Sequence, residues 1–195
     1  MNFRKWVYLF FSTLALGGLS GMITGLVIKG DLNQGIVPLL GLAVWFLGVA
    51  IIFSLISQMG FFAYLTIHRF GLGIFKSVKL WNAVQLVLVA FVLFDLVFFR
   101  YTAFAKAEET IFSYLVLPFL LLILGLIVAF IKQKQTNKQA FVPALFFMTV
   151  VTTLELFPVL RANDSKWVWI MFVPLIVSNI WQMLTLHKLT GTASK

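Results

Sequence analysis

Residues 36–67 read IVPLLGLAVWFLGVAIIFSLISQMGFFAYLTI, and none of these 32 residues is charged. As a helix the run would be about 48 Å long, whereas the hydrocarbon core of a bilayer is about 30 Å thick. Such a run predicts a helix that crosses a membrane, with an excess length that tilt absorbs only in part. Gln58 and Gly60 offer a natural end to the crossing part. We therefore predict a membrane span over 36–58.

The rest of the chain has the same character. Of its 195 residues 62% are hydrophobic and 11% are charged, and the mean hydropathy is +1.04. A soluble domain of this size needs more polar surface. Further apolar runs of membrane-crossing length lie at about 6–28, 80–99, 111–131, 140–160 and 167–187. The sequence predicts an all-α integral membrane protein with six transmembrane helices, built as one membrane domain over 1–195 without a soluble domain.

The basic residues of the short loops predict the orientation, because cytoplasmic loops are enriched in Lys and Arg. One side would hold ten of them: Arg4, Lys5, Arg69, Lys76, Lys79, Lys132, Lys134, Lys138, Lys188 and Lys195. The other side would hold five: Lys29, Arg100, Lys106, Arg161 and Lys166. The acids, including Asp31, Glu108, Glu109 and Asp164, lie in or nearest the second set of loops. We therefore expect a multi-pass cell-membrane protein with both termini in the cytoplasm (N-in/C-in).

The sequence lacks the residues that several classes of protein need for their function. The net charge is +9, but the basic residues are scattered between apolar runs, which does not indicate a nucleic-acid partner. Cysteine is absent, so no disulfide, thiolate nucleophile or cysteine metal site can form. No H-E-x-x-H or G-x-S-x-G motif occurs, and Gly71-Leu-Gly73 lacks the third glycine of a dinucleotide fingerprint. We expect no catalytic residues, no metal and no cofactor.

Two carboxylates, Asp95 and Glu155, lie within the predicted spans, each slightly inside the outer surface. A buried carboxylate is costly unless it is paired or protonated. Arg100 and Arg161 follow these acids in sequence, but neither shares a helical face with the acid before it. We favour ion pairs across helices, Asp95 with Arg161 or Glu155 with Arg100. A proton relay or a ligand site is the alternative.

Amides and glycines indicate helix packing. An inner polar cluster is predicted from five amides near the cytoplasmic ends of the spans: Gln58, Asn82, Gln85, Asn179 and Gln182. Amides can hydrogen-bond between membrane helices, and a small-molecule site is the less favoured reading.

Gly17, Gly21 and Gly25 share one face of the first span and let another helix approach closely. We favour packing within the monomer over dimerisation, with Gly41 and Gly48 as a matching groove on the second span.

The stretch that follows Gly60 mixes aromatic and basic residues. It reads FFAYLTIHRFGLGIFKSVKLW over 61–81. Such a mixture suits the headgroup layer of a membrane. We predict a cytoplasmic ledge there, with basic or titratable members that contact headgroups or a partner: His68, Arg69, Lys76 and Lys79.

Several long motifs resemble one known family. They are SQMGFFAYLTIHRFGLGIFKS, LWNAVQ, FDLVFFRY, KQTNKQAFVPALFFM and TTLELFPVLR. The chain resembles the KinB-signalling pathway activation proteins of spore-forming Bacillus-type bacteria over essentially its whole length. The resemblance implies a multi-pass membrane protein that promotes signalling by a membrane-bound sensor histidine kinase, which feeds the phosphorelay that starts sporulation. It implies no catalytic or ligand-binding residue.

Two other functions stay open. A small proton-coupled or solute transporter would use Asp95 and Glu155, although no repeat symmetry of the transporter kind is visible. An intramembrane enzyme would have only His68 and the two acids, which are predicted on opposite sides of the membrane. The sequence leaves homo-oligomerisation open, and the expected partners are the lipid bilayer and the sensor kinase.

Overall fold

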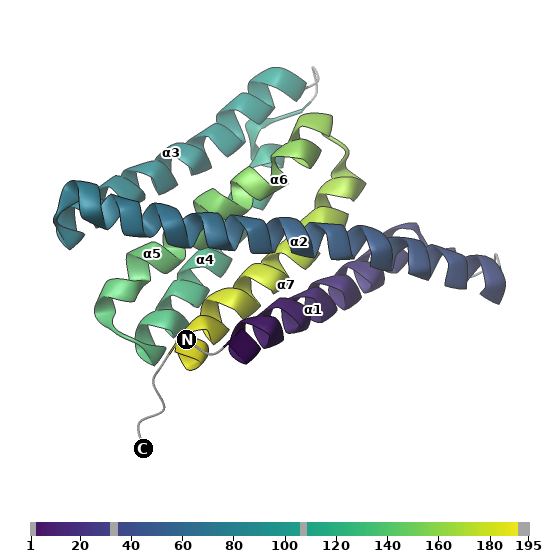
Figure 1. The fold of residues 1–195 in the computed structure, drawn as a ribbon. Coiled ribbons are helices and arrows are strands. Elements are labelled where there is room, and N and C mark those ends of the chain that lie inside the picture. Colours follow the sequence, from purple (N-terminus) through teal and green to yellow (C-terminus); the bar gives the residue numbers. More distant parts are fainter. Residues whose placement is uncertain (1–2, 32–34, 106–108, 191–195) are drawn as a thin grey trace. The chain divides into compact units, whose positions relative to one another are not determined.

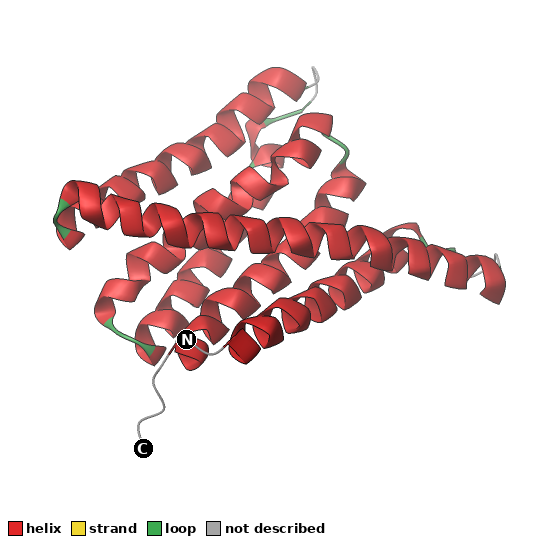
Figure 2. Cartoon of the chain, in the orientation of Figure 1, coloured by secondary structure: helices red, strands yellow, loops and turns green. Residues whose placement is uncertain are grey.

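A computed structural model describes residues 3–31, 35–105 and 109–190, which form helices and short loops with no strand among them (Figure 2). Lys106, Glu108 and Lys195, which entered the orientation argument, lie outside these residues. Within the described chain six helical segments are long and apolar enough to cross a membrane: Phe3–Lys29, Ile36–Phe75, Val78–Phe104, Ile111–Gln135, Lys138–Ala162 and Ser165–Leu189. The predicted all-α fold with six such helices is confirmed, and the orientation of the termini stays a prediction.

The second helix extends beyond the predicted membrane span. Helix α2 runs without a break from Ile36 to Phe75, which is 40 residues. The predicted span over 36–58 therefore lies within a longer helix. A glycine in a helix interior costs only about 1 kcal/mol relative to alanine, so Gly60 does not by itself end a helix. Where within α2 the membrane crossing ends stays a prediction.

The chain packs as two compact units. Unit 1 comprises Met1–Met59 and Pro158–Lys195, and unit 2 comprises Gly60–Phe157. Helices α1 (Phe3–Lys29) and α7 (Ser165–Thr190) lie side by side in unit 1, together with the first part of α2 (Figure 1). The interior of unit 1 includes the buried side chains of Leu9, Phe46, Ala50, Ile170 and Leu175.

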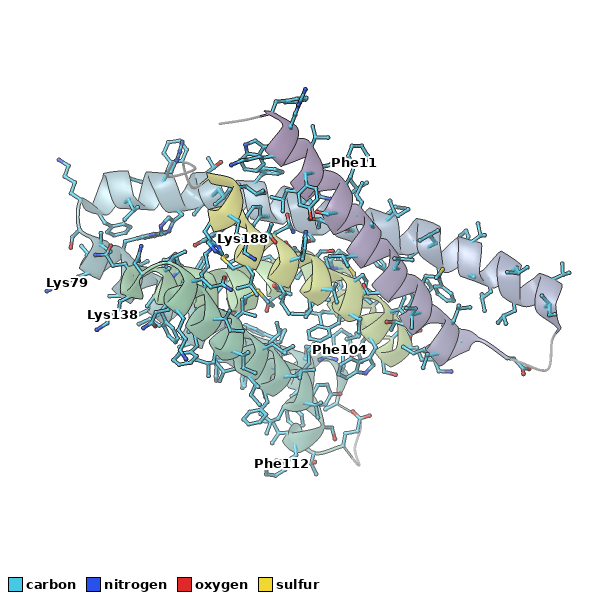
Figure 3. All side chains as sticks on the ribbon, turned by 90° about the horizontal axis from the view of Figure 1, so that it is seen from below. Phe11, Lys79, Phe104, Phe112, Lys138 and Lys188 are labelled. Carbon is cyan, nitrogen blue, oxygen red and sulfur yellow. The ribbon has the colours of Figure 1, made fainter. Side chains whose placement is uncertain are left out.

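Unit 2 contains the second part of α2, all of α3 (Val78–Phe104) and α4 (Val116–Gln135), and most of the fifth span. The rings of Phe61 and Phe147 are fully buried in it, with centroids 5.4 Å apart. The α2–α3 and α4–α5 connections lie at one end of the unit, where Figure 3 labels Lys79 and Lys138. Phe112 lies at the opposite end, in the short 3-10 helix η2 (Ile111–Tyr114) that precedes α4 (Figure 3).

The fifth span is not a uniform α-helix. It consists of η3 (Lys138–Ala140), α5 (Phe141–Phe146), the π-helical turn η4 (Phe147–Val151) and α6 (Thr152–Ala162). Threonine hydroxyls bond backbone carbonyls in and beside this turn. Thr149 donates to the Leu145 carbonyl at 2.8 Å, and Thr153 donates to the Thr149 carbonyl at 2.7 Å. The sequence analysis did not predict this turn.

Candidate functional site

A hydrogen-bonded polar seam runs through the interior of unit 1. The Ser57 hydroxyl donates to Oδ1 of Asn179 at 2.6 Å, and Nε2 of Gln182 donates to the Ser57 hydroxyl at 2.8 Å. All three side chains are buried. Two predicted amides are thus joined through a serine that the sequence analysis did not select. The missed signal is the spacing of Ser54 and Ser57, which places both hydroxyls on one face of an uncharged helix.

Ser54 extends the seam toward α1. Its hydroxyl donates to the Thr13 carbonyl at 3.0 Å and lies 3.1 Å from the Ser178 hydroxyl. Near the same seam, the indole nitrogen of Trp181 donates to the Ser12 hydroxyl at 2.9 Å. Hydrogen bonds of this kind tie membrane helices together, at about 0.6 kcal/mol each on average. The seam therefore joins α1, α2 and α7.

The five predicted amides fall into both units. Gln58, Asn179 and Gln182 belong to unit 1, whereas Asn82 and Gln85 belong to unit 2. Their assembly into one cluster stays a prediction. Their environments differ: the Gln182 amide is well bonded, but neither side-chain atom of Gln85 has a hydrogen-bond partner among the described residues. An unsatisfied buried amide costs roughly 1–3 kcal/mol in proteins.

The glycines of α1 lie at an intramolecular helix interface. A methyl group at Gly21 would overlap the side chain of Ala50 on α2, and one at Gly25 would overlap the ring of Phe46. A methyl group at Gly17 would overlap Ser54 and Ser178. These three glycines therefore let α2 and α7 approach α1 closely.

The predicted matching groove on α2 is wrong. A methyl group at Gly41 or Gly48 would meet no atom of the described chain within 4 Å. The side chains of Phe46, Ala50 and Ser54 take that place instead. Spacing identifies which residues share a helical face, but it does not tell which face turns toward a neighbour.

An aromatic cluster closes the α2–α3 hairpin in unit 2. The indole nitrogen of Trp81 donates to Nδ1 of His68 at 3.0 Å, and the Phe75 ring stacks on the Trp81 ring with centroids 5.5 Å apart. A side chain at Gly71 would overlap that indole. Trp81 is buried and His68 is half-buried. This part of the predicted ledge is thus a packed hairpin end.

The basic residues of the predicted ledge lie at the protein surface. Arg69, Lys76 and Lys79 are exposed. Lys76 has a positive φ of 51°, in the left-handed region that turns the chain between the helices. The following Ser77 caps α3, since its side chain accepts a hydrogen bond from the Leu80 amide. The connection therefore presents its charged side chains outward, whether toward headgroups or a partner.

The predicted outer ion-pair cluster is also divided. Asp95, Arg100 and Glu155 belong to unit 2 and Arg161 to unit 1. Asp95 and Arg100 are half-buried, and Glu155 is 7% exposed. The ion pairs across helices stay a prediction.

Two neighbours of these charges were not anticipated. The guanidinium carbon of Arg100 lies 5.5 Å from the ring centroid of Tyr114, whose hydroxyl donates to Oε2 of Glu109 at 2.7 Å. Glu155 lies against Gly60 of α2, where a methyl group would overlap the carboxylate. Gly60 thus makes room for a buried acid.

Tyr64 makes both a hydrogen bond and an aromatic contact inside unit 2. Its hydroxyl donates to the Pro143 carbonyl at 2.9 Å, just before the π-turn. Its ring packs on that of Phe147 with centroids 5.2 Å apart, and its phenol interacts with the Gln85 amide. Sequence reasoning selected Gln85 but not Tyr64.

The described residues contain no group of three or more His, Asp or Glu side chains that could hold a metal ion. Their polar groups form hydrogen bonds between helices and a basic surface. Such an arrangement suits packing and recognition.

Comparisons with known proteins agree with the resemblance expected from the motifs. The family model KbaA, described as KinB-signalling pathway activation in sporulation, matches residues 17–189. The KinB-signaling pathway activation protein of Bacillus subtilis (strain 168) is 45% identical over 194 residues, which cover 96% of this chain and 98% of that relative. No solved structure matches the chain.

Proposed function

Because the chain belongs to the family of KinB-signalling pathway activation proteins, we propose that it promotes signalling by a membrane-bound sensor histidine kinase of the KinB type. This kinase would feed the phosphorelay that starts sporulation. The family match over 17–189 is the observation that carries the proposal. The chain would act in the cell membrane with both termini in the cytoplasm.

The activation would be allosteric and non-catalytic. A binding partner shifts a conformational equilibrium only by the difference in its affinity for the two states. The chain would therefore bind the membrane region of the kinase more tightly in its active state than in its inactive state. No active site is needed for this.

The contact would involve the exposed basic end of unit 2. Arg69, Lys76 and Lys79 are exposed at the α2–α3 hairpin, whose aromatic side chains are packed behind them. By contrast, Ser57, Asn179 and Gln182 are buried and bonded to one another. The basic side chains are thus better placed for a partner than the polar seam.

A double substitution tests this contact. Arg69→Gln with Lys76→Gln should lower kinase-dependent sporulation signalling while the protein stays abundant in the membrane. Eight of the ten predicted inner charges remain, so insertion should persist. Arg4→Gln with Lys5→Gln removes the same charge from the same predicted side and should signal normally.

The outcomes separate the possible roles of these residues. Normal abundance with normal signalling would reject the contact and leave only a headgroup anchor. Equal signalling losses in both double variants would point to charge in general rather than to this hairpin.

One observation favours a second function. Glu155 is a buried carboxylate in the fifth span, beside Gly60. Ionisable residues inside membrane spans are common in proton and solute pathways. A small transporter using Asp95 and Glu155 would show transport in proteoliposomes that Glu155→Gln abolishes, whereas a kinase activator would show none.

A further inference from the structure

The second half of α2, in unit 2, has a packed face and an open face. The packed face contacts aromatic side chains of unit 2 and comprises Tyr64, His68, Gly71 and Phe75. The opposite face comprises four exposed residues, Thr66, Arg69, Phe70 and Gly73. At about 100° per residue the two sets lie on opposite sides of the helix. We call the four exposed residues the open face.

Gly73 has no neighbour within the chain that requires a glycine. Its backbone is not in the left-handed conformation that favours glycine, and a methyl group there would meet no described atom within 4 Å. At Gly71, by contrast, a methyl group would overlap the Trp81 indole. Glycine in a helix interior is destabilising relative to alanine. The absence of a side chain at Gly73 therefore leaves room for a close approach by another molecule.

Lipid does not account for the open face. Arg69 is exposed on it, and an exposed charge inside the hydrocarbon is costly, so the hydrocarbon should end before this residue. If the crossing ends at Gln58 as predicted, Gly73 lies about 22 Å farther along the helix axis. Even at a tilt of about 40°, Gly73 would lie about 17 Å beyond the hydrocarbon, whereas the headgroup region is about 5–8 Å thick on each side. The Phe70 ring, which is 66% exposed, would then have no lipid to cover it.

The charges around the open face indicate which partner would cover it. Arg69, Lys76 and Lys79 are exposed at this end of unit 2, and no acidic residue occurs between Asp31 and Asp95. A second copy that docked through the same face would bring like charges together, which is unfavourable. An acidic partner would pair with these basic side chains, and an apolar stripe on it would cover Phe70.

We propose that the open face of α2 docks a cytoplasmic helix of the sensor kinase, which carries acidic residues beside an apolar stripe and crosses α2 at Gly73. This inference rests on the proposed function and names the surface through which the kinase would be contacted. A helix that continues from a membrane span of the kinase would be within reach, because α2 itself continues unbroken from its own span.

Leucine at position 73 separates a helix partner from lipid. Gly73→Leu fills the space that the partner backbone would occupy, so kinase-dependent signalling should fall by about tenfold or more, a typical effect of overpacking. The melting temperature of the purified protein should stay unchanged or rise, because a methyl group there meets no described atom and leucine favours a helix. A lipid-facing position would tolerate the leucine, so normal signalling at normal abundance would overturn the proposal. A lower melting temperature would also overturn it, since the face would then be packed within the chain.

Gly48→Leu is the matched control. Gly48 lies on the same helix within the predicted crossing, and a methyl group there likewise meets no described atom within 4 Å. This variant should signal normally. An equal loss of signalling in both leucine variants would reveal a general effect on α2 and would overturn the docking site.

Arg69 tests the acidic character of the partner. Arg69→Glu should lower signalling because like charges would face each other, whereas Arg69→Lys should retain most of the signalling. Normal signalling in Arg69→Glu would overturn the acidic partner helix.

A photo-crosslinking residue at Phe70 gives a readout that does not depend on signalling. In native membranes it should yield a product that contains the kinase, and this product should disappear in a Gly73→Leu background. A product made of two copies of this chain would overturn the proposal in favour of self-association. If deleting the whole chain leaves kinase signalling intact, the proposed function fails. If the deletion abolishes signalling but Gly73→Leu signals normally, only the docking site fails.

Discussion

Ser57 shows how a single hydroxyl can join helices in an apolar environment. Its hydroxyl donates to Oδ1 of Asn179 and accepts from Nε2 of Gln182. It therefore bonds the side-chain amides of two residues on α7. The amides could be selected from the sequence because polar residues in apolar spans are rare. The serine could not, since a short hydroxyl in a helix often bonds its own backbone instead. Whether a serine bonds a neighbouring helix or its own backbone depends on the polar groups that the neighbouring helix places beside it.

Replacing this hydroxyl should destabilise the protein. Ser57→Ala should lower the free energy of unfolding by about 1–2 kcal/mol, because two hydrogen bonds are lost and a buried amide is left poorly satisfied. Thr102→Ala is the control, as the exposed Thr102 hydroxyl bonds the Phe98 and Phe99 carbonyls of its own helix. Thermal melting of both variants in detergent measures the difference. Equal melting temperatures would show that the seam contributes no stability.

Apolar length predicts the number and kind of the helices, but it does not tell how far a helix continues beyond the membrane. All six predicted spans correspond to helices long enough to cross a membrane. Helix α2 continues past the predicted end of its membrane crossing, because an apolar helix can run through a glycine without a change in composition. The π-turn over Phe147–Val151 leaves no mark in composition or spacing, so the sequence does not predict it. The glycines of α1 have close neighbours on α2 and α7, whereas Gly41 and Gly48 of α2 have none among the described residues.

The glycine interface leads to a matched pair of variants. Gly21→Val should destabilise the protein by about 1–3 kcal/mol, the usual cost of overpacking, because the new side chain overlaps Ala50. Gly48→Val should be tolerated, since a methyl group there meets no described atom within 4 Å. Protein abundance in membranes and melting temperature in detergent compare the two. A larger loss for Gly48→Val would mean that the open face of α2 is the tighter interface.

At the scale of the whole molecule, the distribution of charge predicts the topology. Ten of the fifteen Lys and Arg residues fall on the side assigned to the cytoplasm. Cysteines introduced at Thr110 and Ser165 should react with an impermeant thiol reagent added outside intact cells. Cysteines at Ser77 and Thr136 should react only after the membrane is opened. The chain has no cysteine of its own, so each label is unambiguous. The reverse pattern would place the basic end of unit 2 outside and separate it from any cytoplasmic partner surface.

We propose that the chain contacts a sensor kinase through the basic end of unit 2, where Arg69, Lys76 and Lys79 are exposed. A photo-crosslinking residue at Lys79, compared with one at Phe112 at the opposite end of the same unit, tests this most directly in native membranes (Figure 3). We predict a crosslinked product that contains the KinB-type kinase from position 79 and none from position 112. Its yield should fall when Arg69 and Lys76 are replaced by glutamine. A kinase crosslink from position 112 alone, or none from position 79 in cells that signal normally, would show that the basic end of unit 2 does not contact the kinase.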